Sequence, residues 1–87
     1  MHQSHLDIAK RLKRAEGHIR SVIAMMEAGR PCLDLAQQLH AVERAVASAK
    51  KDLIRDHIEH CLDGMATEGP RDARTALKEM RALSKYL

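Results

Sequence analysis

The chain has 87 residues, a single aromatic residue and a formal net charge of +3 at pH 7. This length suits one small domain, and the lack of aromatic residues argues against single-strand nucleic-acid binding, which relies on base stacking. No apolar run is long enough to span a bilayer, no signal peptide is evident, and the period-two patterns of strands are absent. The sequence predicts one all-α domain over residues 1–87, with no membrane partner. Two cysteines in a leaderless chain indicate a reducing cytoplasm.

The first predicted element is a polar N-terminal arm over residues 1–6, which contains His2 and His5. The first helix follows over about residues 5–28, and Ser4 resembles its N-cap.

An apolar stripe with steps of three and four runs along this first helix, as in an amphipathic helix. Gly17 lies inside it and suggests a close approach by another helix, while Gly29 resembles a helix stop. The stripe consists of Ile8, Leu12, Ala15, Ile19, Val22 or Ile23, and Met26.

The second helix is predicted over about residues 31–62, with Pro31 in its first turn. A third is predicted over about residues 70–85, after a break that begins at Asp63-Gly64. A short connection makes the first two helices an antiparallel hairpin, and two hairpins form a four-helix bundle dimer, with a dimer of dimers through the third helix. The stripe of the second helix consists of Leu35, Leu39, Val42, Val46, Ala49 and Leu53.

His57 and Cys61 extend this stripe and are four positions apart, so both side chains leave one helix face and suit a single metal ion. Taken alone this is a weak signal, because such residues are common at helix ends. Cys32 is 29 positions before Cys61, or roughly 44 Å along a continuous helix. If a second copy packed antiparallel, Cys32 of each copy would lie beside His57 and Cys61 of the other, and the dimer would contain two equivalent sites.

Two thiolates and an imidazole suit Cu(I), Ni(II), Co(II) or Zn(II), and do not suit Mg²⁺ or Ca²⁺. Three donors fit trigonal Cu(I), whereas a fourth donor from His2, His5 or the α-amino group would fit Ni(II), Co(II) or Zn(II). An enzyme is not expected, because the sequence shows no phosphate loop, no paired carboxylates and no pocket for a small-molecule substrate.

The first helix is rich in basic residues, which fits either a duplex nucleic-acid partner or a solvated helix face. These residues are Lys10, Arg11, Lys13, Arg14 and Arg20.

The segments RLKRAEGH, LAQQLHAV and HIEHC, with the Cys after Pro31, resemble the copper-sensitive operon repressor family, which includes nickel and cobalt sensors. The resemblance covers roughly residues 8–62. It implies an all-helical dimer, assembled into a tetramer, that binds operator DNA when metal-free. It also implies release on metal binding at the shared site, which derepresses efflux genes. The residues that it places against DNA are Arg11, Arg14 and Lys51, with the adjacent Lys10.

Copper sensors of this family often carry a Tyr before the first Cys and a Glu in the third helix. Here Pro31 precedes Cys32, and Glu79 is out of simple register, whereas the N-terminal histidines resemble the nickel and cobalt branch. Ni(II) or Co(II) is therefore the expected effector, with Cu(I) at Cys32, His57 and Cys61 as the alternative. Further alternatives are a sensor of electrophiles or sulfur species through the two cysteines, and a purely structural helical module.

Overall fold

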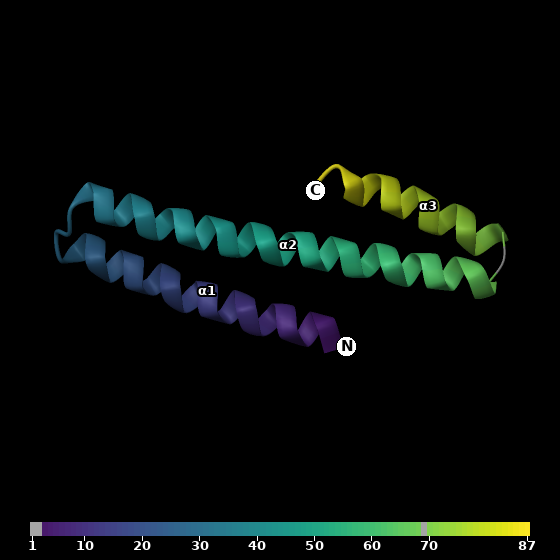
Figure 1. Cartoon of the computed structure of the whole chain (residues 1–87), viewed down its shortest axis with the longest axis horizontal. Coiled ribbons are helices and arrows are strands. Elements are labelled where there is room, and N and C mark those ends of the chain that lie inside the picture. Colours follow the sequence, from purple (N-terminus) through teal and green to yellow (C-terminus); the bar gives the residue numbers. More distant parts are fainter. Residues whose placement is uncertain (1–2, 69) are drawn as a thin grey trace. The chain divides into compact units, whose positions relative to one another are not determined.

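The computed structural model of the chain describes residues 3–68 and 70–87. Within these ranges there are helices and no strands, which confirms the all-α prediction. In the same part of the chain, no helix combines the length and apolar character needed to cross a membrane. The helices (Figure 1) are α1 (Gln3–Glu27), α2 (Cys32–Glu68) and α3 (Pro70–Ser84).

The chain divides into two compact units, Met1–Ala49 and Lys50–Leu87, and α2 contributes to both. In the first unit, α1 runs antiparallel to the first part of α2 (Figure 1). Apolar side chains of the two helices form its core, and the small alanines in it let the backbones approach closely. The buried residues of this unit are Ile8, Ala15, Val22, Val42 and Ala49.

The start of α1 differs from the predicted arm, because the helix begins at Gln3 and includes Ser4 and His5. No Pro or Gly precedes this point, and extending an existing helix adds a hydrogen bond for each residue that is ordered. Ser4 is therefore a helical residue rather than the N-cap, and its buried Oγ has no hydrogen-bond partner among the described residues. His2 lies outside the described residues.

The connection between α1 and α2 is a tight glycine turn. Gly29 has a φ of +74°, a conformation that glycine adopts without steric penalty. The Gly29 and Arg30 amides donate to the carbonyls of Met26 and Met25 at 3.1 and 3.0 Å, the pattern of a Schellman motif. α2 starts directly after Pro31, so Cys32 is its first residue.

α2 continues to Glu68, past the predicted end at Leu62. A single glycine such as Gly64 costs a helix only about 1 kcal/mol relative to alanine, so Asp63-Gly64 does not stop it. α3 begins at Pro70, where the missing proline N–H is tolerated. The connection between α2 and α3 is therefore much shorter than the sequence indicated.

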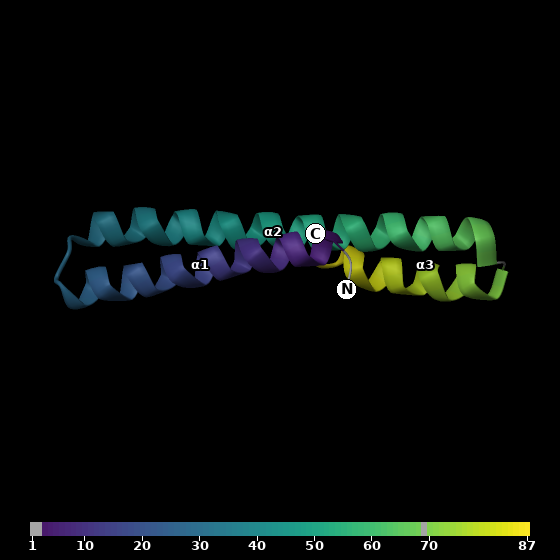
Figure 2. The same ribbon diagram turned by 90° about the horizontal axis from the view of Figure 1, so that it is seen from below.

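The second unit pairs the last part of α2 with α3, which lie side by side in both views (Figures 1 and 2). Ile54 of α2 is buried in this unit. The half-buried residues of α3 follow helical spacing and therefore share one face. They are Ala73, Ala76, Met80 and Leu83.

Only alternate members of each apolar stripe are buried within the chain. On α1, Ala15 and Val22 are buried, whereas Ile19 between them is 41% exposed. On α2, Val42 is buried, whereas Val46 is 43% exposed. The exposed members form a second apolar face on the two helices, and burial of this face requires another chain. Its members are Leu12, Ile19, Ile23, Met26, Leu39, Val46 and Leu53.

Gly17 does not mark a close approach of α1 to another helix of this chain. A Cβ atom added at Gly17 would meet no atom within 4 Å among the described neighbours.

Val46→Asp tests whether this second apolar face is the dimer interface. In a two-fold dimer the substitution removes two apolar contacts and buries two like charges, so it should weaken association by about 100-fold or more, roughly 3 kcal/mol. Sedimentation equilibrium measures this change. The control is Ala47→Asp, at an exposed α2 position outside this face, which should leave association unchanged. A Val46→Asp chain that associates like the wild type would contradict the interface.

Candidate metal centre

Three potential metal-ligating side chains meet in the second unit. His57 and Cys61 lie one turn apart on α2, and Glu79 joins them from α3. One donor atom from each residue lies within 4.8 Å of the other two. His57 and Cys61 are half-buried and Glu79 is exposed, so the group lies at the edge of the α2–α3 contact. The prediction that His57 and Cys61 share a helix face agrees with this geometry.

Glu79 is the residue that the sequence analysis set aside as out of register, although the structure brings it to His57 and Cys61. Its Oε1 lies 2.9 Å from Nε2 of His57, although the ring N–H is not aligned for a hydrogen bond. The signal that could have found this pair is sequence spacing: His57 and Glu79 are nearly equally far along the chain from the α2–α3 connection. In an antiparallel helix pair, such residues face each other. The prediction that α2 ends at Leu62 concealed this register.

Glu79 lies against one ring nitrogen of His57. Metal-binding histidines commonly direct the second ring nitrogen at a carboxylate, which orients the ring and fixes its tautomer. Nε2 faces Glu79, so an ion bound at Nδ1 would leave this contact in place. Glu79 is therefore suited to position His57, and a small rotation of the ring would align the two groups.

The surroundings of Cys61 disfavour its thiolate form. Partial burial raises the pKa of Cys61 above its ordinary value, and the nearby negative charge of Glu79 raises it further. Because a metal binds the thiolate, a metal at this position must displace a proton from Cys61.

The other predicted ligands belong to the first unit. Cys32 is exposed at the start of α2, directly after the glycine turn. Arg30 and Asp34 flank it and form an ion pair of 3.0 Å. His5 is half-buried in the first turn of α1. Neither Cys32 nor His5 is part of the His57–Cys61–Glu79 group, and their roles as ligands stay predictions.

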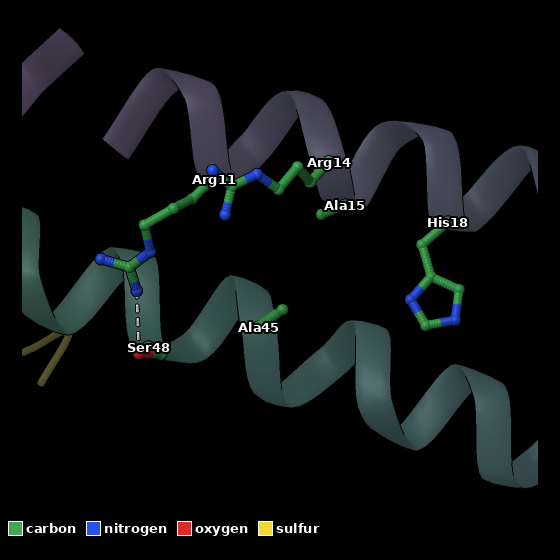
Figure 3. Close-up of a pocket in the computed structure, with 6 residues that line it drawn as sticks. All are labelled: Arg11, Arg14, Ala15, His18, Ala45 and Ser48. Atoms are coloured by element: carbon green, nitrogen blue, oxygen red, sulfur yellow. Dashed lines mark hydrogen bonds between the residues drawn. The ribbon is translucent and has the colours of Figure 1, made fainter. Parts of the chain in front are cut away.

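The basic residues predicted to face DNA are distributed over both units. In the first, Lys10 and Arg14 are exposed on α1, and Arg11 is half-buried. The guanidinium of Arg11 donates to Oγ of Ser48 on α2 at 2.9 Å (Figure 3). Lys51 is exposed on α2 in the second unit. The structure thus exposes three of these four side chains, and Arg11 is held at the seam between α1 and α2.

Comparisons with known proteins consistently find metal-responsive transcriptional regulators. The profile of a family described as metal-sensitive transcriptional repressors matches residues 4–86. The copper-sensing transcriptional repressor RicR of Mycobacterium tuberculosis is 36% identical over 74 residues, covering 85% of this chain and 77% of the relative. The copper-sensing transcriptional repressor CsoR of Bacillus subtilis is 36% identical over 73 residues, covering 84% of this chain and 70% of the relative.

A solved structure, the nickel-responsive transcriptional regulator InrS, has the same fold. It superposes with a TM-score of 0.83 at 31% sequence identity, and the match covers 94% of this chain and 91% of InrS.

Glu79→Gln tests the electrostatic coupling in this group. The carboxylate of Glu79 raises the pKa of Cys61, so removal of its charge should lower that pKa toward its ordinary value. The pKa of Cys61 should still stay above its ordinary value, because partial burial is the larger cause of the shift. The thiolate absorbance of reduced, metal-free protein, followed against pH in a Cys32→Ala background, measures the change. An unchanged or raised pKa in the glutamine variant would show that Glu79 does not act on Cys61.

Proposed function

The chain belongs to the metal-sensitive transcriptional repressor family, and we propose that its effector is Ni(II) or Co(II), bound between two copies of the chain. The protein is a metal-sensing transcriptional repressor and not an enzyme. In this proposal the metal-free form binds operator DNA in the cytoplasm, and metal binding releases it and derepresses metal efflux genes. The convergence of His57 and Cys61 on one face of α2 is the observation that carries the metal site.

The chemistry of the donors restricts the ion. A thiolate and an imidazole are soft to borderline ligands, which suit late transition metals and do not suit Mg²⁺ or Ca²⁺. The donor atoms of His57 and Cys61 are close enough to bind one ion. The two residues are therefore an incomplete site to which further donors must be added.

We assign the missing thiolate to Cys32 of a second copy. Cys32 and Cys61 are 29 positions apart on α2, so an antiparallel pairing of two α2 helices would bring the start of one beside His57 and Cys61 of the other. The exposed apolar face on α1 and α2, including Leu39 and Val46, supports such a pairing. Association of two such dimers into a tetramer, through α3, completes the proposed assembly.

A fourth donor would distinguish nickel or cobalt from copper. His2, His5 and the α-amino group are the candidates, and the resemblance of InrS, a nickel-responsive regulator, favours a site of this kind. With four donors the site would be planar for Ni(II) or tetrahedral for Co(II), whereas Cys32, His57 and Cys61 alone suit trigonal Cu(I).

Cu(I) is the second candidate because two observations favour it. The named relatives RicR and CsoR are copper-sensing repressors. In addition, Glu79 does reach His57, as the third-helix Glu of copper sensors would be expected to do, although its sequence position had argued against this.

Sensing of electrophiles or sulfur species through Cys32 and Cys61 has less support. The thiolate is the reactive form of cysteine, and the raised pKa of Cys61 disfavours that form. A thiol sensor also has no need for the imidazole of His57 beside Cys61.

Coupling between the metal and DNA runs, in this proposal, through the α1–α2 hairpin. A bound ion would link Cys32 of one copy to His57 and Cys61 of the other. Cys32 directly follows the turn that joins the two helices, so its displacement shifts α1 against α2. Arg11 and Arg14 on α1 contact DNA in the metal-free form, and the shift lowers DNA affinity, which is a coupling free energy between two sites.

The first test is an anaerobic absorption titration of reduced, untagged protein with Ni(II), followed by Cu(I) against a competing chelator. Ni(II) should give an intense thiolate-to-metal band that saturates at one ion per chain. Cys32→Ala and His57→Ala should abolish the band, because each removes a ligand. His40→Ala, at an exposed α2 position, should retain it.

The outcomes of this titration separate the candidates. Weak Ni(II) binding with chelator-resistant Cu(I) would replace the nickel assignment by the copper assignment. Failure of both metals to bind tightly would overturn the metal site and leave thiol sensing as the leading alternative.

The DNA surface has its own test, Arg14→Ala. With a duplex selected by the wild-type protein from a random library, loss of one phosphate contact should weaken binding and reduce the salt slope by about 0.9 for each contact. Metal affinity should stay the same. Lys85→Ala removes an equal charge from the exposed chain end and should have little effect. Equal losses in both variants would mean that general charge, and not this surface, governs binding.

A further inference from the structure

A hydrogen bond joins the middle of α1 to the first part of α2. His18 Nε2 of α1 lies 2.7 Å from Gln38 Oε1 of α2, and the pair is partly buried. Figure 3 shows the His18 ring pointing from α1 toward α2. Because the amide oxygen only accepts, Nε2 carries the proton in this contact. The contact therefore links two helices of the first unit through one directional bond.

The buried packing of the hairpin is apolar, and it defines the axial position of α1 less strictly than this bond does. Buried residues such as Ala15, Val22 and Val42 have short side chains, and apolar contacts have no preferred direction. A hydrogen bond, in contrast, weakens steeply when its distance or angle changes. Sliding of α1 along α2 would therefore break the His18–Gln38 bond before it removed much apolar contact.

Gln38 lies close to Cys32 along α2. It follows Cys32 by six positions on the same helix, which is about 9 Å along the helix axis. The helix has no break between the two residues, so a movement of its first turn is carried to Gln38. Arg11 and Ser48 form a further bond between α1 and α2, at 2.9 Å, but it is exposed and lies farther from Cys32 along α2. Of these two bonds, the His18–Gln38 bond is therefore the nearer to the proposed metal ligand.

We propose that the His18–Gln38 bond fixes the register of α1 on α2 and passes a displacement of Cys32 to α1. The inference deepens the proposed function and rests on it, because it names the residues that couple the metal site to the helix placed against DNA. His18 and Gln38 are positioning residues in this proposal, since neither binds the metal. Loss of their bond would leave metal binding in place and weaken its effect on DNA affinity.

A double-mutant cycle tests this pair. The variants are His18→Ala, Gln38→Ala and the double variant, and the readout is the ratio of the DNA dissociation constants with and without Ni(II). The DNA is a duplex selected by the wild-type protein from a random library. Gln37→Ala is the matched control, because it removes the same side chain at the adjacent, exposed position of α2. Circular dichroism and sedimentation should show that all variants keep the helical fold and the association of the wild type.

Each single variant should reduce the wild-type ratio about fivefold, as expected for the loss of one hydrogen bond of typical net strength. The double variant should show no larger loss, because both substitutions remove the same bond. Gln37→Ala should match the wild type, and His18→Gln, which keeps an N–H donor at this position, should retain most of the ratio. Wild-type ratios in both single variants, or losses that simply multiply in the double variant, would overturn this pair as the coupling route.

Hydrogen–deuterium exchange gives a second readout that needs no DNA. In the wild type, Ni(II) should change the exchange of backbone amides in both α1 and the first turns of α2, whereas in Gln38→Ala the change should be confined to α2. An α1 response that is absent from the wild type, or that Gln38→Ala retains in full, would overturn the inference. If Ni(II) leaves the DNA affinity of the wild type unchanged, the proposed release from DNA fails, and the exchange data still decide whether His18 and Gln38 link the helices. Cu(I) takes the place of Ni(II) in both experiments if the absorption titration assigns copper.

Discussion

Burial of an apolar surface that one chain can only half cover is the constraint on which this structure depends. Each stripe on α1 and α2 alternates between residues buried within the hairpin, such as Val22 and Val42, and residues left exposed, such as Ile19 and Val46. Association with another chain would bury the second face, whose exposure to water is unfavourable. A site shared between copies would use the same association that completes the core.

The arrangement around Glu79 connects packing to metal chemistry. One carboxylate faces the ring nitrogen of His57 and raises the pKa of Cys61. If His57 and Cys61 bind a metal, the first contact would help to position the imidazole, and the second would make a proton compete with the metal for Cys61. The packing of α3 on α2 is therefore what brings Glu79 to the two candidate ligands.

The helices and their stripes were predictable from the sequence because they depend on periodicity within a few turns. The split of each stripe into buried and exposed halves was not, because it depends on how two helices pack. The end of α2 was also mispredicted, since Asp63-Gly64 resembles a stop that a packed helix tolerates. That error shifted the expected register of α3, so Glu79 was not recognised as a neighbour of His57. The His57–Cys61 pair could be predicted because it follows from helical spacing alone.

The turn at Gly29 has a mechanical consequence. Two backbone hydrogen bonds close it, and Cys32 follows within three residues, so the connection has almost no slack in which a displacement of Cys32 could be lost. A long, flexible loop could instead change its own conformation when Cys32 moved, and α1 would then stay in place. The short connection therefore places Cys32 directly beside the turn of the hairpin that also carries Arg11 and Arg14.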